Sequence, residues 1–142
     1  MNNPTIQFNF LKPISLGERT GLKRFLASLF RKEKIPMAEL RYIFCSDDYL
    51  LEINRQFLQH DYYTDIITFN LAEKGHPING EIYISVDRVR ENARDFASPV
   101  RKELHRVIFH GALHLCGYRD KTNKEKLEMR NKEDRALESY FN

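Results

Sequence analysis

Several features that define other classes of protein are missing from this chain of 142 residues. It has only two cysteines, Cys45 and Cys116, which are too few for a disulfide scaffold and are interpreted as free thiols. No apolar run approaches the length of a membrane span, and the segment from Met1 to Phe10 lacks the basic region and apolar core of a signal peptide. These absences predict a cytoplasmic protein that contacts no membrane.

Repeats, low-complexity tracts and linkers are also absent, so nothing divides the chain into parts. Its length and its 42% of hydrophobic residues suit one globular domain with a real core. The net charge of +3 is small but unevenly distributed. Residues 12–34 carry seven basic and two acidic groups, residues 37–87 three and nine, and residues 88–106 six and three. The two basic segments could attract phosphates, although charged helix faces are more often simply solvated.

Two periodicities alternate along the chain and predict its secondary structure. Apolar residues at every second position indicate four strands, near residues 6–10, 40–44, 65–71 and 81–86. Cap residues before apolar stripes indicate about five helices, with the caps at Ser15, Ser46, Asp87, Ser98 and Thr122. Two of these caps form a capping-box pattern with the glutamate three residues later, at Ser15–Glu18 and Thr122–Glu125. Because strands separated by helices favour parallel crossovers, we expect an α+β fold: a single domain with a four-stranded mixed sheet.

The stretch from His110 to Asp120 carries the strongest sign of chemistry. Within a helix over residues 99–116, His110 and His114 lie four residues apart on one face, where both imidazoles can reach one ion. Gly117 can end the helix in a left-handed conformation, so that Asp120 folds back as a third ligand. Three protein ligands leave one coordination position open, as in a catalytic rather than a structural zinc site. The alternative is a pair of half-buried histidines that bond only to the backbone.

This spacing also matches part of the metzincin protease pattern H-E-x-x-H-x-x-G-x-x-H, with Asp120 at the position of the third histidine. Gly111, however, replaces the glutamate that serves those proteases as general base, which disfavours peptide hydrolysis. Two histidines and one carboxylate would also suit non-haem iron. Cys116 lies two residues from His114 and therefore on another face of the helix, so it is not expected to be a ligand.

The same stretch resembles the signature H-G-x-L-H-L-x-G-Y-D-H of the YbeY family of bacterial rRNA-maturation endoribonucleases. The identical positions are His110, Gly111, Leu113, His114, Leu115, Gly117 and Tyr118. Two positions depart, because Arg119 stands where the family usually has Asp, and Asp120 where it usually has the third histidine. Three upstream blocks resemble the family's N-R, T-D-V-L-S-F and G-D-I blocks in the same order, at Asn54-Arg55, residues 64–69 and residues 80–82. The resemblance therefore runs from about residue 40 to 133.

The resemblance implies that residues 1–142 form a single metal-dependent endoribonuclease-like domain that cuts single-stranded RNA. Its role would be rRNA maturation at the 3′ end of 16S rRNA and ribosome quality control, with rRNA and the ribosomal subunit, but not DNA, as partners. One Zn²⁺, or another divalent ion, at His110, His114 and Asp120 would lower the pKa of its water and polarise a phosphodiester. Arg55 is implied to be needed for activity, and its guanidinium suits the charge of a phosphodiester transition state.

A second hypothesis is a noncatalytic ribosome-assembly module in which a structural metal tightens the fold and the basic faces dock on RNA or protein.

Other side chains have two interpretations each. Asp65 is either a partner of a ligating histidine or a residue that ends a loop, and Glu81 is either a base or a strand-edge charge. Three tyrosines either stack on RNA bases or pack in the protein, namely Tyr62, Tyr63 and Tyr118. The remaining histidines are interpreted as structural or surface residues, namely His60, His76 and His105.

Overall fold

The computed structural model describes residues 3–142, so Met1 and Asn2, which begin both the predicted domain and the segment examined for a signal peptide, lie outside the described residues. The strands are β1 (Thr5–Phe10), β2 (Met37–Cys45), β3 (Ile66–Asn70) and β4 (Ile78–Ser85). The helices are α1 (Arg19–Lys32), α2 (Asp47–Leu58), α3 (Val86–Asp95), α4 (Val100–Leu115) and α5 (Asn123–Phe141). Among the described residues, no helix has both the length and the apolarity needed to cross a membrane.

The four strands form one mixed sheet in the order β1-β2-β4-β3. β1 and β4 both run parallel to β2, whereas β3 runs antiparallel to β4. The parallel pairs are joined through intervening helices, and the antiparallel pair is joined by the turn after Asn70. The predicted α+β fold with a four-stranded mixed sheet and five helices is confirmed.

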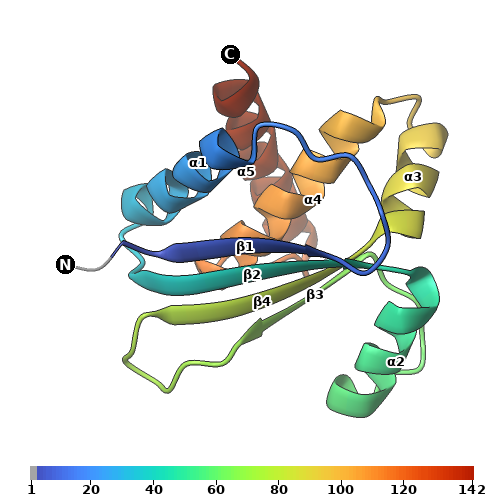
Figure 1. Ribbon diagram of the computed structural model, residues 1–142, viewed down its shortest axis with the longest axis horizontal. Coiled ribbons are helices and arrows are strands. Elements are labelled where there is room, and N and C mark those ends of the chain that lie inside the picture. The colour runs from blue at the N-terminus through green and yellow to red at the C-terminus, as the bar shows by residue number, and fades with distance from the viewer. Residues whose placement is uncertain (1–2) are drawn as a thin grey trace.

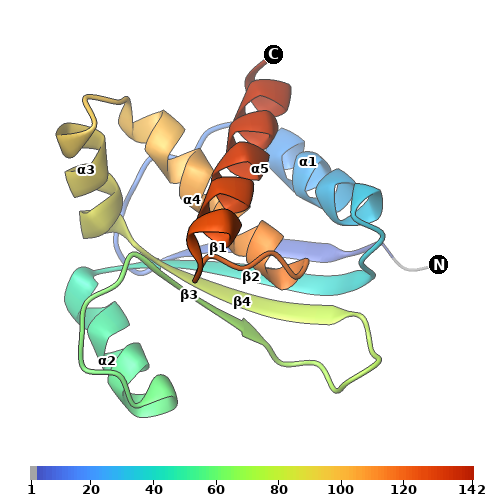
Figure 2. The same cartoon turned by 180° about the vertical axis from the view of Figure 1, so that it is seen from behind.

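Helices cover the two faces of the sheet unequally (Figures 1 and 2). α1, α3, α4 and α5 lie on one face, and α2 lies alone on the other side, near the end of the sheet where β2 leads into it. The larger core fills the first side, and α4 runs through its centre with seven consecutive buried residues, Glu103 to Phe109. Tyr42 of β2 ties this helix to the sheet, because its buried hydroxyl donates to the Ile108 carbonyl at 2.8 Å.

α4 approaches the sheet closely at Gly111. A Cβ atom at this position would lie 2.8 Å from Ile82 Cγ2 and 3.0 Å from Ile66 Cδ1, which is closer than packed side chains allow. The absence of a side chain therefore sets the distance between this helix and strands β3 and β4. It also means that position 111 faces the sheet, so a glutamate could not fit there without moving the helix.

The structure confirms some predicted caps and corrects others. The Ser46 hydroxyl accepts from the Tyr49 amide, and Thr122 with Glu125 forms a complete capping box. The box predicted at Ser15 is wrong, because Ile14 and Leu16 are buried outside the helix and α1 begins only at Arg19. Burial of these two side chains holds the segment in an irregular conformation, which delays the start of the helix.

The caps predicted for α3 and α4, Asp87 and Ser98, are also wrong. β4 runs directly into α3, so its last residue, Ser85, becomes the cap and accepts from the Arg88 amide. Asp87 lies one residue inside the helix, and its carboxylate instead binds Lys12 and the Asp47 amide. Before α4 the cap residue is Pro99, which has no side chain that can accept a hydrogen bond.

Candidate metal centre

The three predicted ligands meet at one point beside the end of α4. His110 and His114 lie on the last two turns of this helix, and Gly117 follows with a φ of 107°, the left-handed conformation expected for it. The turn closes as the Tyr118 amide donates to the Leu113 carbonyl at 3.1 Å, and it returns the chain toward the helix. One ligand atom each of His110, His114 and Asp120 then lies within 4.8 Å of the others.

Hydrogen bonds fix the orientation of both imidazoles. His110 Nδ1 lies 2.6 Å from Glu133 Oε2, and His114 Nδ1 lies 2.6 Å from the carbonyl oxygen of Tyr118. An ionised carboxylate and a carbonyl can only accept, so both Nδ1 atoms carry the hydrogen. In the neutral rings, both Nε2 atoms therefore present lone pairs, and both face Asp120, at 3.3 Å and 3.9 Å from its carboxylate oxygens. Two lone pairs directed at a carboxylate are the arrangement that a cation requires.

Glu133, on α5, is a site residue that the sequence interpretation missed. It is buried and 23 positions from His110, and it uses its two oxygens for different partners. Oε2 accepts from His110, while Oε1 accepts from Arg106 Nη1 at 3.0 Å. Arg106 also binds Asp134 at 2.8 Å, so a chain of charges joins α4 to α5 beneath the ligands. Burial alone would lower the pKa of His110, but the hydrogen bond and charge of Glu133 outweigh this effect and raise the pKa.

A cavity of about 480 Å³ opens in front of the ligands. One wall is formed by α4 and the end of the segment before α5. The other wall is formed by the end of α2, by four residues of the loop that follows it and by strand β3; the four loop residues are His60, Tyr62, Thr64 and Asp65. Figure 2 shows these segments on the side of the molecule where the chain enters α5. Among residues 3–142, Lys121 is the one lysine or arginine that lines the cavity, and Asp65 lines it as an additional carboxylate. Burial raises the pKa of Asp65, although the nearby His110 opposes the shift.

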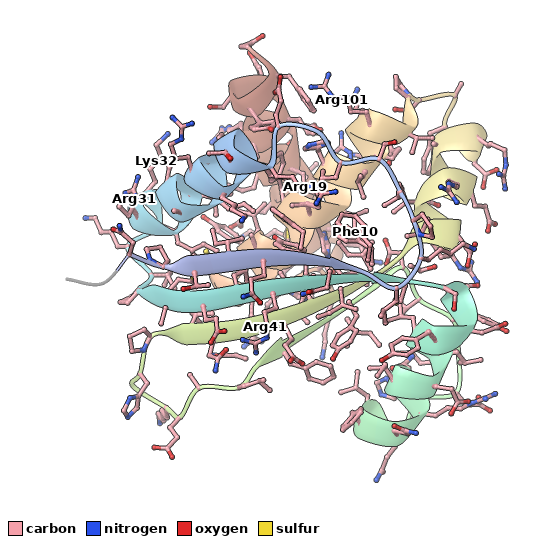
Figure 3. All side chains as sticks on the ribbon, in the orientation of Figure 1. Phe10, Arg19, Arg31, Lys32, Arg41 and Arg101 are labelled. Atoms are coloured by element: carbon pink, nitrogen blue, oxygen red, sulfur yellow. The ribbon has the colours of Figure 1, made fainter. Side chains whose placement is uncertain are left out.

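Asp65 and Glu81 were considered in the sequence as a histidine partner and a base. The carboxylate that binds a ligand imidazole is that of Glu133, and within residues 3–142 neither imidazole is hydrogen-bonded to Asp65. Glu81 pairs with Arg41 and accepts from the Tyr83 hydroxyl, on the face of the sheet opposite α4. Figure 3 shows Arg41 on that face, away from the helical layer. Glu81 is therefore remote from the ligands.

Arg55 lies on the last turn of α2 and is not among the residues that line the cavity. Its Nε donates to Asp61 at 2.5 Å and its Nη1 to Glu52 at 2.9 Å. All three side chains are exposed, so these ion pairs are weak and easily exchanged. In the sequence Asp61 lies between two lining residues, His60 and Tyr62, so the guanidinium contacts the loop that carries them.

The two basic segments of the sequence lie elsewhere. None of residues 12–34 or 88–106 is among the residues that line this cavity. Figure 3 shows Arg31 and Lys32 at the end of α1, and Arg101 at the start of α4, on the helical side of the sheet. The electrostatic attraction that these segments offer therefore acts at other surfaces than the cavity.

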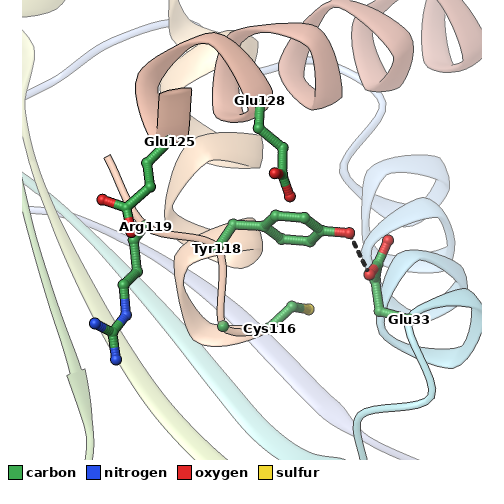
Figure 4. Close-up of a pocket in the computed structure, with 7 residues that line it drawn as sticks. Glu33, Cys116, Tyr118, Arg119, Glu125 and Glu128 are labelled. Atoms are coloured by element: carbon green, nitrogen blue, oxygen red, sulfur yellow. Dashed lines mark hydrogen bonds between the residues drawn. The ribbon is translucent and has the colours of Figure 1, made fainter. Parts of the chain in front are cut away.

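The side chain of Tyr118 belongs to a second pocket, on the other side of the turn (Figure 4). Its hydroxyl donates to Glu33 at 2.8 Å, and Lys132 lies 5.1 Å from its ring centre. This pocket, of about 310 Å³, also contains the carboxylates of Glu125 and Glu128. Packing within the protein therefore explains the ring, and the contribution of Tyr118 to the candidate metal centre is its carbonyl oxygen.

The other histidines differ in their surroundings. His105 is buried against Tyr140, with ring centres 5.3 Å apart, which confirms a structural role. His76 is exposed in the turn between β3 and β4, which confirms a surface position. His60 is also exposed, but it lines the cavity of the candidate metal centre.

Comparisons with known proteins identify the family. A family model described as Endoribonuclease YbeY matches residues 14–141. A protein named Endoribonuclease YbeY from Cytophaga hutchinsonii is 56% identical over 122 residues, which cover 86% of this chain and 85% of the relative. The protein of that name from Flavobacterium psychrophilum is 47% identical over 135 residues, covering 95% and 96%. The solution structure of TM1509 from Thermotoga maritima matches with a TM-score of 0.66 and 33% identity, covering 96% of this chain and 89% of that one.

Proposed function

Since this chain belongs to the endoribonuclease YbeY family, we propose that it cuts single-stranded RNA at the cavity in front of His110, His114 and Asp120. The observation that carries the proposal is the orientation of the two imidazoles. Both Nδ1 atoms are occupied by fixed acceptors, so both Nε2 lone pairs face one carboxylate at the wall of an open cavity. A structural pair of histidines would not need this convergence.

We propose that these three residues hold one Zn²⁺ ion. Two imidazoles and a carboxylate form a ligand set that suits zinc and also non-haem iron, and elemental analysis of the purified protein distinguishes the two. When bound, such an ion would supply Lewis-acid activation of water and neutralise charge on a phosphodiester. The role of Glu133 is to keep His110 in the tautomer that leaves Nε2 free, and the Tyr118 carbonyl does the same for His114.

Two further residues receive roles in the cleavage. Arg55 exchanges its weak pairs with Glu52 and Asp61 for a phosphate of the strand, where its guanidinium stabilises the charge that develops during cleavage. Asp65 lines the cavity, and burial raises the pKa of its carboxyl, which makes the carboxylate a stronger base for accepting and returning a proton. Its proton would come from the attacking group, water or the RNA 2′-hydroxyl.

The biological substrate that we propose is rRNA, at the 3′ end of 16S rRNA, within or beside the ribosomal subunit. This assignment rests on the family to which the chain belongs. Ribosome quality control is the wider process in which such a cleavage would serve. A site of action on ribosomal subunits places the activity in the cytoplasm, and residues 1–142 are proposed to act as one catalytic domain.

The test is cleavage of a labelled single-stranded RNA by purified protein, before and after chelation, with duplex RNA and single-stranded DNA of the same sequence as controls. We expect cleavage of the single-stranded RNA alone, loss of activity on chelation and recovery with Zn²⁺. Asp120→Ala should lose most of the bound metal, whereas Glu128→Ala, an exposed carboxylate outside the cluster, should keep it. Full activity after verified metal removal would refute the metal-dependent mechanism.

The same experiment separates the alternatives. A noncatalytic ribosome-assembly module would bind RNA and metal without cleaving either the labelled single-stranded RNA or rRNA. A metalloprotease is disfavoured by the structure as well as by the sequence, because Gly111 packs against Ile82 and Ile66 and leaves no room for a general base at that position.

A further inference from the structure

A pair of stacked aromatic rings stands at the cavity, on the wall opposite the candidate ligands. The rings of His60 and Tyr62 have centres 5.1 Å apart and planes inclined by 20°. The Tyr62 hydroxyl and His60 Nδ1 are hydrogen-bonded at 3.0 Å, so the two rings form one unit. Tyr62 is 56% exposed, which means that this pair does not serve to cover the hydrophobic core.

The backbone beneath these rings is held by a buried residue. The carbonyl of Asn54 accepts from the His60 amide at 3.1 Å, and its side-chain amide donates to the Tyr62 carbonyl at 2.9 Å. Asn54 itself is only 2% exposed. Gln59 turns the chain out of α2 in the left-handed conformation, with a φ of 56°. One buried residue therefore holds both ring-bearing residues, His60 through its backbone carbonyl and Tyr62 through its side-chain amide, so the ring pair is preorganised in the free protein.

The position and charge of the cavity indicate what the rings bind. His60 and Tyr62 line the same cavity as His110, His114 and Asp120. The lining contains two carboxylates, Asp65 and Asp120, against one lysine, so without metal it offers little attraction to phosphates. In the absence of metal, a strand that enters this cavity gains its affinity for the lining mainly from groups other than its phosphates. Aromatic faces supply such affinity to unpaired bases of any sequence.

We propose that His60 and Tyr62 form a stacking platform for one unpaired nucleobase of the strand that is cut at the candidate metal centre. The proposal rests on the proposed ribonuclease function and adds a subsite to it. Only an unpaired base can present its face to the platform, so the platform selects single-stranded over duplex RNA. It also places the neighbouring phosphate in the direction of the ligands, since both share one cavity.

The test measures RNA binding, with the metal removed by chelation so that the strand stays intact. Fluorescence anisotropy with a short labelled single-stranded RNA compares Tyr62→Leu with Tyr62→Phe and with Tyr63→Leu. Tyr63 is the matched control: it is 47% exposed, but its hydroxyl donates to Asp48 and it does not line the cavity. We expect Tyr62→Leu to bind roughly tenfold more weakly, and Tyr62→Phe and Tyr63→Leu to bind close to wild type.

A second series varies the RNA instead of the protein. A single abasic position is moved along the strand, and at one position wild-type binding should weaken by roughly the same tenfold factor. That position should have no further effect in Tyr62→Leu, because the two changes remove the same contact. The RNA series on wild type decides the question even if Tyr62→Leu does not fold.

The outcomes separate the platform from the function on which it rests. Equal binding by wild type and a folded Tyr62→Leu, or abasic effects that are uniform along the strand, overturn the platform while wild-type cleavage keeps the proposed function. A wild-type protein that neither binds nor cuts single-stranded RNA overturns both.

Discussion

At the scale of single residues, the exposed ion pairs of Arg55 decide between a structural and a functional role. Its partners Glu52 and Asp61 are both exposed, so the pairs contribute little to stability. We expect Arg55→Ala to lower the rate of RNA cleavage by roughly 10²–10³-fold while metal content and melting temperature stay nearly unchanged. Arg94→Ala, the basic residue in the last turn of α3, is the control and should leave the rate unchanged. Unfolding of Arg55→Ala would instead assign the residue to the structure.

Glu133 gives a second prediction at this scale. His110 and Arg106 donate to different oxygens of Glu133, and a glutamine in the same position would face one of them with an NH2 group, which cannot accept. We expect Glu133→Gln to weaken metal binding by roughly 10–100-fold, measured by competition with a metal-binding dye.

The control for this prediction is Asp134→Asn. Asp134 binds Nη2 of Arg106 and is not paired with His110. Loss of the Asp134 charge should therefore leave metal affinity close to wild type. An equal loss in both variants would show that the packing of Arg106, and not the orientation of His110, governs the site.

The sequence was sufficient to predict that His110, His114 and Asp120 converge, because all three positions belong to one helix and the turn that follows it. It was not sufficient for Glu133, whose contact with His110 depends on how α5 crosses α4. A signal was nevertheless present. Glu133 lies four residues after Met129 and four before Leu137, so it occupies a position in the buried stripe of its helix. A charge in such a stripe requires a partner.

At the scale of elements, the caps make a paired test. Thr122 closes a complete capping box at the start of α5, whereas Ser15 makes no cap, because α1 begins after Glu18. We expect Thr122→Ala to lower the free energy of unfolding by about 1 kcal/mol, and Ser15→Ala to change it by less than about 0.5 kcal/mol, as measured by urea denaturation. Equal costs would mean that a box does form at Ser15 in solution.

The two helical glycines make another pair with opposite expected signs. Gly21 of α1 has open space around its missing Cβ, so Gly21→Ala should stabilise the protein by about 0.5–1 kcal/mol. Gly111→Ala places a Cβ against Ile82 and Ile66 and should destabilise it by roughly 1–3 kcal/mol. A shift of α4 would also move both ligands, so weaker metal binding should accompany the loss of stability. A stabilising Gly111→Ala would show that the helix does not pack this closely.

The same comparison shows where sequence patterns lose information about elements. Periodicity placed all four strands and five helices, because alternation and stripes follow from which side of an element faces the core. The starts of α1 and α3 were misplaced, because they depend on contacts across the fold. Ile14 and Leu16 are buried by distant segments, and Asp87 is drawn to Lys12 and Asp47. Cap motifs describe local preferences and do not take such contacts with distant segments into account.

At the scale of the whole molecule, His110 links stability to pH. Its pKa is raised in the folded, metal-free protein, so the folded state holds this proton more tightly than the unfolded state. The resulting stability is complete below about pH 6.5, the ordinary histidine value, and is lost as pH rises through the raised folded value. In chelator-treated protein, the difference in free energy of unfolding between wild type and His110→Ala should therefore be larger at about pH 6 than at about pH 8.5. A difference that grows with pH would contradict the pairing with Glu133.

The two walls of the cavity differ in the free energy needed to open them. The ligand wall is built on α4 and α5, which share buried apolar and charged contacts, whereas residues 59–63 are all exposed. Within this segment the Asn54 contacts to His60 and Tyr62 hold the backbone to α2. Thermal opening of the loop therefore breaks few bonds and exposes little apolar surface, while opening the helical wall requires nearly global unfolding. Each opening of the loop therefore leaves the positions of the ligands unchanged, and the Asn54 contacts return His60 and Tyr62 to the cavity when the loop closes.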